Sequence, residues 1–213
     1  MIIVYLLSYP QFVSTLGMIQ RREFMTKVAL TGGSFISVQI INPASSLASD
    51  TMIVAGGKPQ YGDESIMSQK AHGTSNQPVQ ENLRYGVSTK LADKICNYNR
   101  HFAEFSGYYA SSSFEQEMRK SSRPVVFYDS VTGKPLFKAP INRSVDEFLA
   151  ETEIHGWPSF RDQEVIWDNV RILRNGETVS LDGTHLGHNL PDRKGNRYCI
   201  NLVSIAGSPM VTL

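Results

Sequence analysis

The feature that most constrains this chain is a run of alternating side chains near its C-terminus, at residues 197–205. Arg197, Cys199 and Asn201 alternate there with aromatic and aliphatic residues. Such a run predicts a β-strand, in which side chains repeat every two residues and these three share one face. A cation beside a thiol favours the thiolate, the nucleophilic form. The run therefore predicts a site for thiol chemistry or, in the alternative, a buried cysteine in a core strand.

Two histidines, His185 and His188, lie just upstream of this strand. Imidazoles give and take protons near neutral pH, so they are suited to assist a reactive thiol. Two histidines alone do not make a structural zinc site, which usually needs four nitrogen or sulfur ligands. We expect residues 185–197 to form a loop, in which the two histidines are either site residues or solvated side chains.

Three blocks of this sequence occur in the order found in a known family. HLGH at residues 185–188 and RYCIN at residues 197–201 resemble the C-terminal signature of the methionine-R-sulfoxide reductase B family. GWPSF at residues 156–160 is similar to the family's other signature, and PLF at residues 135–137 is a weaker third match. The resemblance covers roughly residues 123–205. It implies a fold built on two antiparallel sheets.

The resemblance implies a peptide-methionine (R)-S-oxide reductase, an enzyme that reduces methionine-R-sulfoxide in proteins. Cys199 would attack the sulfoxide sulfur and become a sulfenic acid. His185 and His188 would bind and protonate the sulfoxide oxygen. Trp157 and Phe160 would form the substrate pocket, since sulfur and methyl groups contact aromatic rings favourably.

Two further residues match positions of the family's site. Asp192 would orient an imidazole, or else it is a residue of a Pro-Asp turn. Asn201 would donate a hydrogen bond to the substrate, or it would satisfy a buried backbone group.

The sequence departs from the family at its zinc site. Many members hold zinc with two Cys-x-x-Cys pairs, and this chain has Asp129, Thr132, Val179 and Asp182 at the corresponding positions. We therefore predict no structural zinc and no other bound cofactor. A thioredoxin-like reductant would act as co-substrate by thiol–disulfide exchange.

The second cysteine, Cys96, is open to three interpretations. In many relatives the resolving thiol directly precedes the GWPSF motif, and here that position is His155. Cys96 is then predicted to be the resolving cysteine that forms a disulfide with Cys199. In the alternative, the chain is a non-catalytic ligand- or protein-binding module, and Cys96–Cys199 is a permanent structural disulfide. In the third interpretation, Cys96 is a half-buried helix residue without a redox role.

The first 48 residues are predicted to be a targeting leader. RREFM at residues 21–25 resembles a twin-arginine export signal, and a moderately apolar run at residues 28–41 follows it. Small residues at positions 46–48 suit a signal peptidase. We expect export to the periplasm or another extracytoplasmic compartment, without stable membrane association after processing. The alternatives are the thylakoid lumen of a plastid and a transmembrane anchor.

The rest of the chain is predicted to be a linker followed by one domain. Residues 49–86 are polar and rich in glycine, without a sustained period, which is typical of a linker. Residues 87–102 have apolar positions at helical spacing, and short strand patterns with turn signals follow. We therefore predict an α+β domain, mostly β, over residues 87–213. The net charge of +1 gives no electrostatic case for nucleic acid or an anionic membrane as a partner. The expected partners are oxidised proteins and the reductant.

Overall fold

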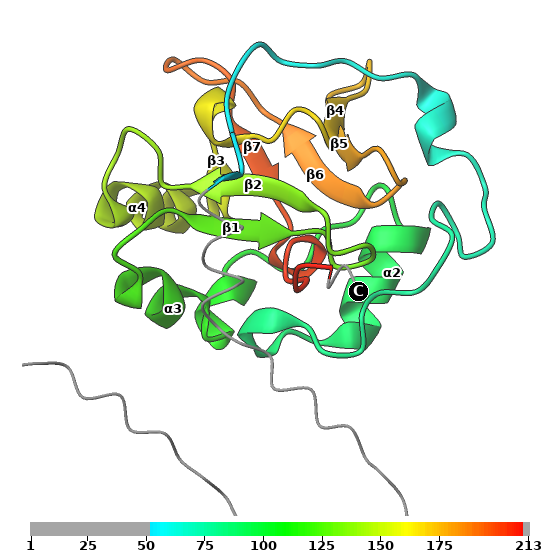
Figure 1. Ribbon diagram of the computed structural model, residues 1–213, viewed down its shortest axis with the longest axis horizontal. Helices are drawn as coiled ribbons and strands as arrows, with labels where there is room; N and C mark the ends of the chain where they lie inside the picture. Colours follow the sequence, from blue (N-terminus) through cyan, green and yellow to red (C-terminus); the bar gives the residue numbers. More distant parts are fainter. Residues whose placement is uncertain (1–51, 211–213) are drawn as a thin grey trace, which may run out of the picture. The chain divides into compact units, whose positions relative to one another are not determined.

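The computed structural model describes residues 52–210, which form a mixed α/β domain with mostly strands (Figure 1). A two-stranded antiparallel sheet pairs β1 (Val125–Tyr128) with β2 (Pro135–Ala139). A five-stranded antiparallel sheet has the order β3-β7-β6-β5-β4. Its strands are β3 (Ser159–Phe160), β4 (Val170–Ile172), β5 (Glu177–Ser180), β6 (His185–Asn189) and β7 (Tyr198–Ile200). The predicted α+β class with two antiparallel sheets is thus confirmed.

The described helices follow in chain order, and the first is shorter than the apolar spacing over residues 87–102 predicts. They are α2 (Thr89–Tyr98), α3 (Phe114–Lys120) and α4 (Val145–His155). Ser88 caps α2 by accepting a hydrogen bond from the backbone N–H of Leu91 (3.3 Å). Ser144 and Glu147 form a capping box at the start of α4, which satisfies two N–H groups that the first turn leaves without a partner. Five short 3-10 segments complete the described elements: η1 (Glu64–Met67), η2 (Arg84–Gly86), η3 (Tyr108–Ser111), η4 (Asp162–Glu164) and η5 (Leu202–Ser204).

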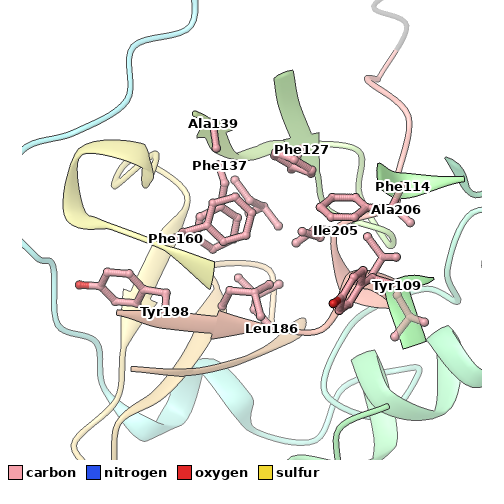
Figure 2. Packing of buried hydrophobic residues seen from close by; sticks show 14 of the residues in the cluster. Tyr109, Phe114, Phe127, Phe137, Ala139, Phe160, Leu186, Tyr198, Ile205 and Ala206 are labelled. Atoms are coloured by element: carbon pink, nitrogen blue, oxygen red, sulfur yellow. The ribbon is translucent and has the colours of Figure 1, made fainter. Parts of the chain in front are cut away.

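The core lies between the two sheets. Figure 2 shows side chains of β1 and β2 turned toward those of β3, β6 and β7. Phe160 of β3 stacks on Phe137 of β2 with ring centroids 4.3 Å apart, and Phe127 of β1 meets Phe160 edge-on at 5.2 Å. Offset and edge-to-face pairs of this kind stabilise a core beyond the area that they bury. The aromatic cluster therefore fixes the smaller sheet against the strands that carry the candidate site.

The segment that we expected to be a polar linker packs against the domain in its described part. Met67, Val79 and Tyr85 are buried, although they are widely spaced in the sequence. The N–H of Gly56 donates to the carbonyl of Val165 (2.8 Å), and Tyr61 bridges to Ile172 of β4. A few apolar anchors and backbone hydrogen bonds are enough to order a segment that has no periodicity, so the linker prediction is corrected for residues 52–86.

The predicted leader at residues 1–48 lies outside the described residues. Within residues 52–210, no helix has both the length and the apolar character needed to cross a lipid bilayer.

A buried carboxylate connects the turns of the two sheets. Asp129, which follows β1, accepts hydrogen bonds from the N–H of Val131 (2.8 Å) and from the hydroxyl of Thr184, just before β6 (2.9 Å). Burial raises the pKa of Asp129, and these hydrogen bonds oppose that shift. Nearby, the ammonium of Lys134 forms an ion pair with the partly exposed Asp182 (2.9 Å).

Replacing the buried carboxylate tests its contribution to stability. We expect Asp129→Ala to lower the free energy of unfolding by about 2–4 kcal/mol, because two buried donors lose a charged acceptor. Asp182→Ala is the control, and it should cost at most about 1 kcal/mol because its ion pair is screened by water. Urea denaturation measures both variants. Equal effects of the two substitutions would contradict this account of the turn.

Candidate active site

A cavity of about 270 Å³ lies beside β6 and β7. Five predicted site residues line it: Trp157, His185, His188, Cys199 and Asn201. His101 and Phe102, from the segment after α2, and Leu190, after β6, also line the cavity. The structure thus brings the thiol, both imidazoles and the tryptophan to one hollow. Arg197, Asp192, Phe160 and Cys96 do not line it.

Both histidines face the cavity because β6 contains a bulge. Residues 185–197 were expected to form a loop, but His185–Asn189 is a strand between β5 and β7. Two side chains three residues apart point to opposite faces of a regular strand. Here Thr178 pairs with Gly187 and Val179 with His185, so one extra residue of β6 interrupts the alternation. That extra residue, Leu186, is fully buried in the core (Figure 2).

Gly187 allows β6 to approach β7 beside the thiol. Its φ is +154°, and a Cβ atom there would lie 2.1 Å from the backbone oxygen of Cys199. Only glycine fits so close a contact. At the next position along β6, His188 pairs directly with Cys199. The glycine of the HLGH motif therefore holds an imidazole opposite the cysteine.

β7 is shorter than the predicted strand. The strand ends at Ile200, and η5 follows Asn201, so the predicted run to Ile205 is corrected. Asn201 donates its side-chain N–H to the carbonyl of Leu186 (3.1 Å) and is buried. Its amide thus satisfies a backbone group of β6, which was the structural alternative, while the residue also lines the cavity.

Burial outweighs the cation in setting the state of the thiol. Burial raises the pKa of Cys199, whereas the charge of Arg197 and a hydrogen bond from it lower the pKa. The balance lies above the ordinary value, so the resting thiol is protonated at neutral pH. The prediction that Arg197 holds Cys199 as a thiolate is corrected: Arg197 opposes the cost of burial without overcoming it.

Asp192 contacts arginines and not the predicted imidazoles. Its carboxylate accepts two hydrogen bonds from the guanidinium of Arg161 (2.7 and 3.0 Å) and lies 3.7 Å from Nε of Arg197. The hydrogen bonds from Arg161 hold the pKa of Asp192 well below its usual range. The prediction that Asp192 orients an imidazole of the HLGH motif is therefore corrected. The carboxylate of Asp192 instead helps to hold Arg197, which precedes β7.

A buried carboxylate orients His185. Oε1 of Glu177 accepts a hydrogen bond from Nδ1 of His185 (2.8 Å), and Arg100 donates to the same carboxylate (2.6 Å). Burial alone would raise the pKa of Glu177, but these bonds outweigh it and lower the pKa. An ionised acceptor at Nδ1 fixes the tautomer of the imidazole and stabilises an imidazolium when one forms. Nε2 is then the nitrogen that exchanges a proton.

His188 has a different environment. Its ring lies edge-on to that of His185, with the centroids 5.6 Å apart. Burial and the neighbouring His185 lower the pKa of His188, so its neutral form is favoured. The two imidazoles are thus distinguished by their surroundings: one is paired with a carboxylate and the other is desolvated.

Trp157 lies in the wall of the cavity, whereas Phe160 does not. The indole N–H of Trp157 donates to the backbone carbonyl of Glu104 (3.1 Å), which orients the ring. Phe160 is fully buried in the aromatic core. Its ring packs beneath the strand beside the cavity. The prediction that Phe160 forms part of the substrate pocket is therefore corrected.

Cys96 is fully buried in α2 and packs against η5. Its sulfur lies 3.6 Å from the hydroxyl of Ser204 and 4.0 Å from the carbonyl of Val203. Both cysteines are free, and burial raises the pKa of Cys96. The proposed permanent disulfide is not formed, and a disulfide with Cys199 requires a rearrangement of one or both thiols.

At three of the four positions where the resemblance places zinc ligands, the side chain has another partner or no ligand atom. Asp129 already accepts hydrogen bonds from Val131 and Thr184, Asp182 pairs with Lys134, and Val179 has no ligand atom. Elsewhere in the described residues, Glu151, His155 and Asp192 approach one another within 4.8 Å. Both of these carboxylates are ion-paired with Arg161, which satisfies their charge.

Sequence reasoning missed Glu177, Arg100, His101 and Phe102. The apolar spacing over residues 87–102 predicts a helix that reaches Phe102, but α2 ends at Tyr98 and Phe102 is 65% exposed. Glu177 carried a usable signal. Because the Asn-Gly turn at residues 175–176 precedes it, a strand at His185–Asn189 would have paired it with His188.

A scan against models of known protein families finds no match for this chain.

Replacing Glu177 tests the role of the carboxylate. If the thiol reduces a sulfoxide, as we propose below, Glu177→Gln should slow oxidation of Cys199 about tenfold to hundredfold, because part of a general-acid contribution is lost. Stopped-flow measurement of a single turnover checks the rate. Glu64→Gln is the matched control, since Glu64 is the 63% exposed partner of the same Arg100 and should matter little. Equal rates for Glu177→Gln and wild type would contradict the assignment.

Proposed function

We propose that this protein reduces methionine-R-sulfoxide in proteins, as a peptide-methionine (R)-S-oxide reductase that repairs oxidative damage. One observation carries the proposal: the cavity places Cys199 opposite His188 and beside His185, with Trp157 in its wall. These residues come from the HLGH, GWPSF and RYCIN blocks, which resemble the reductase B family. Two separate signatures that converge on one cavity support a shared role for these residues.

The proposed reaction starts with attack of the Cys199 sulfur on the sulfoxide sulfur. The sulfur–oxygen bond of the substrate breaks, methionine leaves, and Cys199 becomes a sulfenic acid. The thiol is oxidised and the sulfoxide is reduced, so no other electron donor takes part in this step. Arg197 assists because it favours the thiolate against the cost of burial.

Proton transfer is assigned to the histidines. A protonated Cys199 must lose its proton, and the sulfoxide oxygen must gain one, so the two transfers balance within the cavity. Nε2 of His185 suits donation of a proton to the sulfoxide oxygen, since the carboxylate of Glu177 would stabilise the imidazolium that donates it. His188, favoured in its neutral form, suits acceptance of the thiol proton.

The lining of the cavity favours a methionine sulfoxide within a polypeptide. Its lining residues include no Asp, Glu, Lys or Arg. The ammonium and carboxylate of a free amino acid would lose water there without an opposite charge to replace it. The indole of Trp157 and the exposed ring of Phe102 offer apolar contacts for the substrate's methyl group and its neighbours.

Regeneration requires a thiol. The sulfenic acid condenses with a second thiol and releases water, and a thioredoxin-like dithiol then exchanges with the disulfide. Cys96 is the proposed resolving thiol, although it must first leave its contact with η5. We also propose export through the twin-arginine signal, and a site without structural zinc or another bound cofactor.

The test is turnover of separated epimers of N-acetyl methionine sulfoxide amide with dithiothreitol as reductant. We expect the R epimer to be reduced and the S epimer to be inert, and Cys199→Ser to lose activity because a hydroxyl cannot form the sulfenic acid. Ser159→Ala is the control, since Ser159 pairs with Cys199 in the sheet but does not line the cavity. Turnover by Cys199→Ser, or none by the folded wild type, would reject the proposal.

A further inference from the structure

Glu104 joins two walls of the cavity although it lies in no helix or strand. It follows His101, Phe102 and Ala103, which line the cavity from the segment after α2. Glu104 is buried, with a relative exposure of 3%. A carboxylate this deeply buried is costly to maintain unless it is hydrogen-bonded.

Both oxygens of the carboxylate are used. Oε1 accepts a hydrogen bond from the N–H of Leu202 (2.6 Å) and Oε2 accepts one from the N–H of Val203 (3.0 Å). These are the first two residues of η5, the turn that follows Cys199 and Asn201. The side chain thus satisfies two backbone donors that the short turn cannot satisfy itself.

The backbone of the same residue holds the opposite wall. The carbonyl of Glu104 accepts the indole N–H of Trp157 (3.1 Å). One residue therefore connects the indole in the wall, the segment at His101 and the turn after the thiol. Sequence reasoning did not single it out, because a glutamate in an irregular segment carries no periodic signal.

We infer that Glu104 is a positioning residue, which locks the segment that carries His101 and Phe102 onto the turn after Cys199 and fixes the indole of Trp157 in the cavity wall. This role in turnover rests on the proposed function. The three hydrogen bonds of Glu104 do not depend on that function, because their effect can be measured without any sulfoxide substrate.

The charge of Glu104 has a second effect. Beyond burial, the negative charge of Glu104 raises the pKa of both thiols, Cys96 in α2 and Cys199 in β7. The residues of η5 that contact Glu104 have no ionisable side chain. Burial raises the pKa of Glu104 itself to about 7, although the two N–H donors oppose the shift. Below that pH the carboxyl group gains a proton and loses its charge.

The test uses Glu104→Gln on the full chain, without substrate. An amide has one acceptor oxygen, so it cannot accept from both N–H groups and its own N–H₂ meets one of them. In a Trp167→Phe background, where Trp157 is the remaining tryptophan, we expect stronger quenching of its fluorescence by acrylamide. We also expect faster alkylation of Cys199 by iodoacetamide, by about threefold to tenfold at pH 8 and less at pH 6, because a negative charge has been removed. Peptide mass spectrometry separates Cys199 from Cys96.

Three further variants serve as controls for this test. Glu153→Gln removes an exposed carboxylate of α4 and should change neither readout. Asp129→Ala lowers stability without removing a hydrogen bond of Glu104, so it controls for loosening of the whole domain. Glu104→Asp keeps the charge on a shorter side chain, so it should increase the quenching but not the alkylation, and it serves if Glu104→Gln does not fold.

The outcomes separate this inference from the proposed function. If Glu104→Gln matches wild type in both quenching and alkylation, or if Asp129→Ala changes both as strongly, the inference is overturned. If wild type does not reduce the sulfoxide, the proposed function fails, while these two readouts still decide the role of Glu104. Where turnover is measured, we expect Glu104→Gln to raise KM more than it lowers kcat, because the wall that contacts the substrate has moved.

Discussion

The pairing of β6 with β7 is the interaction on which the site depends. Gly187 permits the two backbones to approach, and the bulge around Leu186 turns both His185 and His188 toward the cavity while the core remains filled. A side chain at position 187 would force the strands apart at the backbone of Cys199. The pairing thereby places both histidines of the HLGH motif in the cavity that Cys199 lines.

Burial and charged partners compete to set the pKa values of this site, and the balance differs between residues. Burial raises the pKa of Cys199 more than Arg197 lowers it, whereas the hydrogen bonds of Glu177 outweigh its burial. In the sheet, His188 pairs with Glu177 on one side and with Cys199 on the other, while the carboxylate of Glu177 accepts a hydrogen bond from His185. In the proposed reaction, the protonated thiol must first give up its proton, and the imidazoles of His185 and His188 in the cavity are the groups suited to accept it.

The patterns and motifs of the sequence were enough to predict the α+β class with two antiparallel sheets and the five residues that meet in the cavity. It did not reveal β6, because a bulge breaks the alternation by which a strand is recognised. The partners of the carboxylates were also beyond reach: Asp192 accepts hydrogen bonds from Arg161, 31 residues away, and the carboxylate of Glu104 accepts from N–H groups 98 and 99 residues away. Tertiary contacts of this kind leave no local pattern.

The most direct test of the central claim is detection of the sulfenic acid on Cys199. The Cys96→Ser variant, which lacks the proposed resolving thiol, is mixed with one equivalent of N-acetyl methionine-R-sulfoxide amide and dimedone, and its peptides are weighed by mass spectrometry. The account predicts one dimedone adduct on Cys199 for each methionine formed, and none with the S epimer. Absence of both adduct and methionine with the R epimer, in a folded protein whose Cys199 still alkylates, would contradict it.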